Sequence, residues 1–212
     1  WSCATTRGSS SEDGYGGGVA EVKGGLPVRR VIMLGAPGSG KGTQALHLAE
    51  SLQVPAISTG EMLREAVAAG SELGARVEGV MAAGALVADD LMGEVVASRL
   101  ERDDARAGFI LDGYPRTTGQ AETLDGILAR AGVKIERVLL LEVPEAELIR
   151  RALGRGRADD REEVIRERLR VYREKTEPLI SFYRERGLLA TVDGYQPVAT
   201  VTAALIAALG AD

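Results

Sequence analysis

Residues 35–44 read Gly-Ala-Pro-Gly-Ser-Gly-Lys-Gly-Thr-Gln and directly follow an apolar run, Val-Ile-Met-Leu, at 31–34. The spacing of Gly35, Gly40 and Lys41 is that of a phosphate-binding loop between a strand and a helix. Backbone N–H groups at the start of such a helix form an anion site, and the lysine adds a positive charge. A glycine turn that only caps a helix is the alternative, but it does not account for the lysine. We therefore predict a phosphate site at this loop.

One position departs from the common pattern of these loops. Gly42 stands where a Ser or Thr hydroxyl usually binds magnesium, and Thr43 follows it. Because Mg²⁺ readily keeps several water ligands, we expect it to be held less directly, through Thr43, water and a carboxylate elsewhere. Asp112 is the best candidate, since it ends the apolar run 109–111. A turn or helix-capping aspartate before Gly113 is the alternative.

The pattern around the loop alternates between strands and helices. Strands are expected at 31–34, 54–57, 109–111, 138–143 and 188–192, and helices at 41–52, 61–69, 72–83, 90–101, 120–131, 145–153, 160–173, 177–186 and 198–209. This alternation predicts a parallel sheet covered by helices on both faces, with sites at the carboxyl ends of the strands. Residues 58–87 are all helical in pattern and too long for an ordinary crossover. They are either an inserted moving segment or a pair of packing helices.

Composition narrows the class of protein. The chain has 212 residues, a net charge of −5 and one cysteine, Cys3. The charge argues against nucleic acid or an anionic membrane as partner, and the single cysteine excludes an internal disulfide and a cysteine-based zinc site. No apolar run approaches the ~20 residues that span a membrane. We expect a cytoplasmic protein in which His47, the one histidine, is structural or exposed. The 22 Arg against 4 Lys reflect either codon bias or function.

The first 27 residues differ from the rest. They hold seven Gly and four Ser with little periodic apolar content. Such a segment is typical of a disordered extension or a misplaced start, and we exclude it from the fold, which is expected over 28–212.

Three further motifs follow the loop. They are residues 57–64 (Ile-Ser-Thr-Gly-Glu-Met-Leu-Arg), 108–117 (Gly-Phe-Ile-Leu-Asp-Gly-Tyr-Pro-Arg-Thr) with Gln120, and 156–160 (Gly-Arg-Ala-Asp-Asp) with Arg168. Together and in this order, the four motifs closely resemble the adenylate kinases, a family of nucleoside monophosphate kinases. The resemblance runs from about residue 28 to the C-terminus, and the Lys-Gly-Thr sequence is the form that the loop takes in such enzymes.

The resemblance implies a P-loop α/β/α fold with a five-stranded parallel sheet, an AMP-binding insertion at 58–87 and a short lid over ATP at 154–160. It implies the reaction of Mg-ATP with AMP to give two ADP, with Mg²⁺ but no zinc. ATP, AMP and ADP are then the partners of a chain expected to be a monomer.

The resemblance also assigns roles to individual residues. Those placed at ATP are Gly38, Ser39, Gly40, Lys41, Gly42, Thr43, Arg151, Arg155 and Gln196. Those placed at AMP are Thr59, Arg64, Ala85, Leu86, Val87, Gly113, Tyr114, Pro115, Arg116, Gln120, Arg157 and Arg168. Those implied in catalysis are Lys41, Asp112, Arg116, Arg157 and Arg168.

Arginine suits this chemistry. Phosphoryl transfer depends mainly on positioning and charge stabilisation, and the guanidinium group is planar, always charged and bidentate toward phosphate. Thr59 and Gln120 favour AMP over a pyrimidine acceptor, because the glutamine amide donates and accepts side by side along one edge of adenine. A UMP or CMP kinase, a nucleotide sensor without turnover and a hydrolytic ATPase remain as alternatives.

Overall fold

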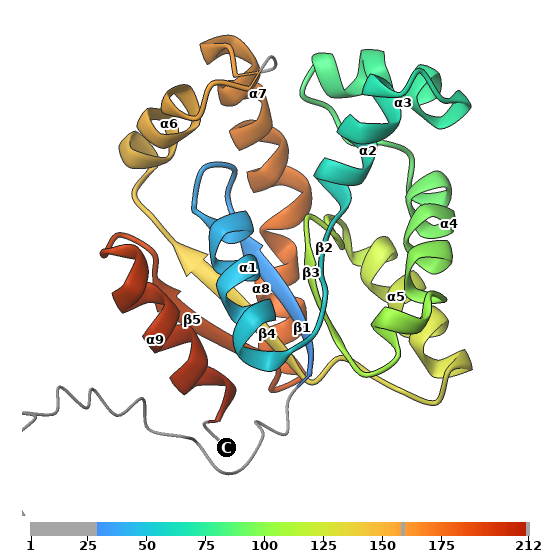
Figure 1. The fold of residues 1–212 in the computed structure, drawn as a ribbon. Coiled ribbons are helices and arrows are strands. Elements are labelled where there is room, and N and C mark those ends of the chain that lie inside the picture. The colour runs from blue at the N-terminus through green and yellow to red at the C-terminus, as the bar shows by residue number, and fades with distance from the viewer. Residues whose placement is uncertain (1–28, 158–159, 211–212) are drawn as a thin grey trace, which may run out of the picture.

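The computed structural model describes residues 29–157 and 160–210. The predicted extension at 1–27 lies outside this range, as do Ala158 and Asp159 of the predicted lid. A five-stranded parallel sheet with the order β2-β3-β1-β4-β5 forms the centre (Figure 1). Its strands are β1 (Arg30–Gly35), β2 (Ala56–Ser58), β3 (Phe109–Asp112), β4 (Arg137–Glu142) and β5 (Leu189–Asp193). The predicted α/β fold with five parallel strands is confirmed.

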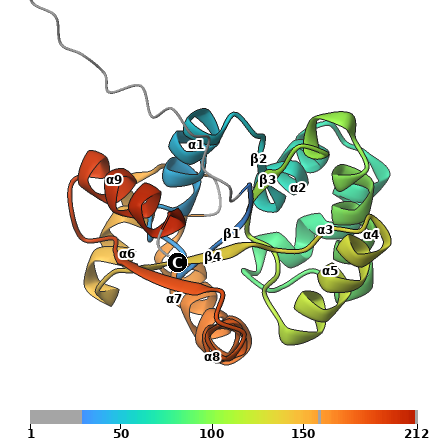
Figure 2. The ribbon, with the colours of Figure 1, turned by 90° about the horizontal axis from the view of Figure 1, so that it is seen from below.

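Helices cover both faces of this sheet, as Figure 2 shows. Their bounds are α1 (Lys41–Leu52), α2 (Thr59–Ala68), α3 (Glu72–Ala82), α4 (Asp89–Leu100), α5 (Thr118–Arg130), α6 (Glu145–Gly154), α7 (Glu162–Val171), α8 (Pro178–Glu185) and α9 (Val198–Leu209). Side chains alternate across β1, so Val31 and Met33 pack with α1 and α9, while Ile32 and Leu34 pack with α4, α5 and α8. Because β1 is buried on both faces, its carboxyl end is fixed where the phosphate loop begins.

Most of the predicted boundaries differ from the structure by one or two residues, and two of these differences have a clear cause. The helix expected over 160–173 is α7, which continues into the π-helical segment η2 (Tyr172–Thr176) before α8. Pro178 begins α8. It has no N–H group to donate within a continuous α-helix, which accounts for the change of geometry before it. The strand expected over 54–57 begins at Ala56, because the N–H of Val54 instead donates to the carbonyl of Ala49 at the end of α1.

The segment between β2 and β3 holds the helices of the predicted insertion. α2 and α3 pack against each other, and the side chain of Ser71 caps α3 by accepting from the N–H of Gly74 at 3.1 Å. In Figure 1 this pair lies beside the upper end of the sheet, opposite α6 and α7. No helix in the described part of the chain is long and apolar enough to cross a membrane.

Candidate functional site

A cleft of about 1050 Å³ opens at the carboxyl ends of the strands. It lies between the phosphate loop, α2, residues 84–87, the turn after β3 and the arginines of α6 and α7. Most of the predicted site residues line it: Gly38, Gly40, Lys41, Gly42, Thr43, Thr59, Arg64, Ala85, Leu86, Val87, Asp112, Gly113, Pro115, Arg116, Gln120, Arg151, Arg155, Arg157 and Arg168. The structure thus brings four separate sequence motifs to one cavity.

Three predicted residues lie outside the wall of this cleft. Ser39 is 2% exposed and packs inside the phosphate loop. Tyr114 is 1% exposed, and its hydroxyl donates to the carbonyl of Gln120 at 3.2 Å. Gln196 is exposed, and its amide donates to Asp193 at 2.8 Å. The predicted nucleotide contacts of these three residues therefore stay predictions without support from the cavity.

The phosphate loop is shaped by its backbone. Gly38 has φ of 89°, and a Cβ added there would clash with the carbonyl oxygen of Leu148 in α6. Gly40, with φ of 98°, is the N-cap of α1. Both conformations favour glycine, because a side chain is strained at such φ values. The loop therefore brings its glycines and the start of α1 to the wall of the cleft without side chains in the way.

Lys41 lies across the base of this loop. Its ammonium donates to the carbonyls of Gly35 at 2.7 Å and Ala36 at 3.0 Å. Burial lowers the pKa of Lys41 to about 8, the Asp112 carboxylate opposes this shift, and Arg116 adds to it. The lysine thus lies in surroundings where an added phosphate would stabilise its charge.

Asp112 ends β3 directly opposite position 42. A Cβ added at Gly42 would lie 3.6 Å from Asp112 Oδ2. The carboxylate therefore faces the position that carries a hydroxyl in common phosphate loops. Within the described residues no group of three or more His, Cys, Asp or Glu side chains could hold a metal ion. A cation brought in by phosphates could use one protein carboxylate through water, and Asp112 is placed for that contact.

Arg116 is held by the turn after β3. Its Nε donates to the carbonyl of Gly113 at 2.8 Å, and its own carbonyl accepts from the hydroxyl of Thr176 at 2.9 Å. Burial lowers the pKa of the guanidinium, an effect that the Asp112 carboxylate opposes. The backbone of the turn and η2 together fix this partly buried cation in the cleft.

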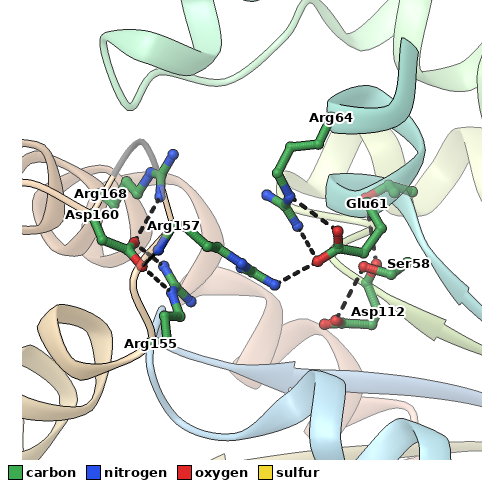
Figure 3. Close-up of polar contacts among 9 residues, drawn as sticks. Ser58, Glu61, Arg64, Asp112, Arg155, Arg157, Asp160 and Arg168 are labelled. Atoms are coloured by element: carbon green, nitrogen blue, oxygen red, sulfur yellow. Dashed lines mark hydrogen bonds and ion pairs between the residues drawn. The ribbon is translucent and has the colours of Figure 1, made fainter. Parts of the chain in front are cut away.

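A carboxylate that the sequence analysis did not single out joins two predicted arginines. Glu61 Oε1 accepts from Arg64 at 2.6 Å and also from Nη2 of Arg157, which reaches it from the far side of the cleft (Figure 3). Hydrogen bonding to Arg64 is the main reason that the pKa of Glu61 is lowered. In this structure Glu61 thus occupies guanidinium groups that are predicted to bind phosphate.

Asp160 forms a second junction, where the connection between α6 and α7 approaches the start of α7. Both its carboxylate oxygens accept from Arg155, at 2.7 and 2.8 Å, and Oδ2 accepts from the backbone N–H of Arg157 at 3.1 Å. Arg168 lies 3.9 Å from Oδ1, and its Nη2 also donates to the carbonyl of Met81 in α3. Asp160 therefore contacts Arg155, Arg157 and Arg168. These three residues and Arg64 form the arginine cluster of Figure 3.

Arg151 is held in the same manner near the end of β5. Its Nε donates to Glu147 at 2.6 Å, and Nη1 donates to the carbonyl of Gly194 at 3.0 Å. Hydrogen bonds from Arg150 and Arg151 lower the pKa of Glu147 to about 2. Glu61 and Asp160 lie inside the sequence motifs, and each has an arginine partner three to five positions away. The contact between Glu61 and Arg157 has no such local signal, because the two residues are 96 positions apart.

A phosphate loop at the end of a buried strand, facing a cleft of clustered arginines, defines the P-loop phosphotransferases as the class of this protein. A family model described as adenylate kinase matches residues 33–188. A curated adenylate kinase of Thermobifida fusca (strain YX) is 51% identical over 184 residues, which is 85% of this chain and 97% of the relative. Adenylate kinase 1 of Synechocystis sp. is 52% identical, and the match covers 81% of this chain and 91% of the relative. An adenylate kinase of Stenotrophomonas maltophilia (strain K279a) is 48% identical, and the match covers 86% of this chain and 100% of the relative. The chain belongs to the adenylate kinase family.

Proposed function

We propose that the chain transfers a phosphoryl group from Mg-ATP to AMP, reversibly, and so forms two ADP in the cleft described above. Its family and its curated relatives support this reaction. The single observation that carries the proposal is the placement of Lys41, Arg116, Arg157 and Arg168 around one cavity. Two nucleotides that meet there bring many negative charges together, and these four cations can neutralise them.

In this proposal the two sides of the cleft bind different nucleotides, ATP on one side and AMP on the other. The phosphate loop and Lys41 hold the β and γ phosphates of ATP, with Arg151 and Arg155 beside them. Arg64, Thr59, Gln120 and the backbone of 85–87 hold AMP. Arg116, Arg157 and Arg168 stabilise the charge on the group in transfer, where positioning and electrostatics supply most of the rate enhancement.

Magnesium fits the residues at the loop. When bound, Mg²⁺ neutralises phosphate charge and helps to orient the transferring group. Asp112 would hold its water ligands and Thr43 would contribute from the start of α1, which agrees with the carboxylate that faces position 42.

Residues 58–87 act as the AMP-binding insertion and residues 154–160 as the short ATP lid in this proposal. The contact between Glu61 of α2 and Arg157 of the lid shows that these two segments approach each other. Both nucleotide sides come from one chain, so a monomer is sufficient for activity. Closure of both segments would exclude water, which otherwise competes with AMP for the phosphoryl group.

A coupled assay for ADP formation tests the proposal. We expect ADP to form from Mg-ATP only when AMP is added, with UMP and CMP as poor acceptors. ADP formation without AMP would identify a hydrolytic ATPase, and preference for UMP or CMP would identify a pyrimidine nucleotide kinase. ATP binding without turnover on any monophosphate would leave a nucleotide sensor.

A further inference from the structure

The side-chain amide of Gln120 has a protein partner at each end. Gln120 lies in the first turn of α5 and is 2% exposed. Its Oε1 accepts from the backbone N–H of Arg116 at 2.7 Å, and its Nε2 donates to Asp89 Oδ1 at 2.7 Å. Asp89 begins α4 and belongs to none of the groups assigned above.

We propose that Asp89 is a positioning residue that makes the site select adenine over a purine with the opposite hydrogen-bonding edge, because its carboxylate fixes the orientation of the Gln120 amide. This inference rests on the proposed function, since it concerns how the acceptor base is chosen.

The two partners leave the amide only one favourable orientation. A carboxylate can only accept hydrogen bonds, and a backbone N–H can only donate. If the amide turned over, its oxygen would face the oxygen of Asp89, and its NH₂ group would face the N–H of Arg116. Both contacts would be repulsive, and the polar groups involved would lose their partners at a buried position.

Within the part of the chain that the structure describes, one donor and one acceptor of the amide remain for a ligand. A glutamine amide has two N–H donors and an oxygen with two lone pairs, and Asp89 and Arg116 each take one. Adenine presents an acceptor at N1 beside a donor at its 6-amino group. Hypoxanthine presents the reverse at the same two places, a donor at N1 beside an acceptor at O6. A fixed amide can therefore match only one of the two bases.

Asp89 is itself oriented by a neighbour. Its Oδ2 accepts from the hydroxyl of Thr117 at 2.9 Å, and the same hydroxyl oxygen accepts from the backbone N–H of Gln120 at 3.1 Å. Thr117 is the N-cap of α5, so the carboxylate is tied to the helix that carries the glutamine. Each oxygen of Asp89 thus has one dedicated donor, and the geometry passes from Thr117 through Asp89 to the amide.

The test compares AMP with IMP as acceptors of the intact enzyme, because the two nucleotides differ only along this edge of the base. In Asp89→Asn the partner of the amide can either donate or accept, so a reversed Gln120 is opposed by Arg116 alone. We expect the ratio of kcat/KM for AMP to kcat/KM for IMP to fall at least about tenfold, mainly through better use of IMP. Asp90→Asn is the matched control. Asp90 lies in the same turn of α4, its carboxylate accepts from the N–H of Leu91, and its substitution should leave the ratio unchanged.

The outcomes separate this inference from the proposed function. If the wild-type enzyme makes no ADP from AMP, the proposed function fails. If it does, and Asp89→Asn leaves the ratio within about twofold of wild type or lowers both efficiencies by the same factor, the role of Asp89 is wrong, since the latter is what a merely structural residue would produce. Should the asparagine variant not fold, Asp89→Ala removes the acceptor in another way, and the same shift of the ratio is expected.

Discussion

The phosphate loop and the arginine cluster face each other across one cleft, yet they are built by different means. The loop takes its shape from backbone contacts over ten consecutive residues, 35–44, with glycines at strained φ values. The cluster is assembled from side chains on α2, α7 and the connection between α6 and α7, and Glu61 and Asp160 hold it together. A backbone site is rigid and intolerant of added atoms, whereas an ion-paired site can exchange a carboxylate for a phosphate.

A substitution at Gly38 gives the strongest test of whether the phosphate loop is rigid. In Gly38→Ala the new Cβ would meet the carbonyl of Leu148 at a φ of 89°, so both strain and a clash oppose it. We expect the free energy of unfolding to fall by about 4 kcal/mol, measured by urea denaturation of the ligand-free protein.

Gly40→Ala is the control for this loss. Gly40 has a similar φ of 98°, but no heavy atom lies within 4 Å of an added Cβ. Strain alone should cost about 1–2 kcal/mol. Equal losses in the two variants would show that the contact with α6 does not shape the loop.

Arg116 shares features of the backbone-shaped loop and of the arginine cluster, because the backbone of its turn holds a cationic side chain. We expect Arg116→Ala to lower turnover at least about 100-fold with a near-normal fold, since among the described residues no other guanidinium is held by the turn after β3. Saturating kinetics with Mg-ATP and AMP measure the effect. Arg166→Ala serves as control, because Arg166 pairs with Glu162 on an exposed part of α7. Near wild-type turnover without Arg116 would contradict its assigned role.

The same contrast explains what could be predicted from the sequence. The loop and α1 were predicted from local spacing, because their contacts lie close together in the chain. The five strands and the cleft-lining arginines followed from alternation and from family motifs. Two contacts did not follow from the sequence, since Glu61 and Arg157 are 96 positions apart and Gln120 lies 31 positions from Asp89. Both contacts depend on packing of the whole chain, and no local spacing encodes them.

Lys41 belongs to the phosphate loop, but its pKa is also affected by arginines across the cleft, Arg155 and Arg157 among them. Its pKa in the folded, ligand-free protein is lowered to about 8, so the ammonium is protonated below that pH and neutral above it. A bound phosphate favours the protonated form. The affinity for Mg-ATP should therefore be highest below pH 8 and fall by up to about tenfold per pH unit as pH rises through that value, with proton uptake on binding.

Calorimetric titrations in buffers of different ionisation enthalpy measure that uptake. Lys41→Arg is the control, because a guanidinium stays charged over the whole range and should abolish the slope above pH 8. A wild-type affinity that does not change between about pH 7.5 and about pH 9.5 would show that the lysine keeps its usual pKa.

Glu61 tests whether the cluster exchanges partners. If its carboxylate occupies Arg64 and Arg157 until phosphate arrives, Glu61→Gln should lower the Kd for AMP by a few fold, because an exposed pair contributes only modestly. The variant should also make AMP affinity more sensitive to salt, since the net positive charge of the site rises. Glu65→Gln changes the same charge one turn further along α2, where Glu65 also lines the cleft, and it controls for the general field. Weaker AMP binding in Glu61→Gln would mean that the carboxylate holds the arginines in their phosphate-binding positions, and the cluster would then be as preorganised as the loop.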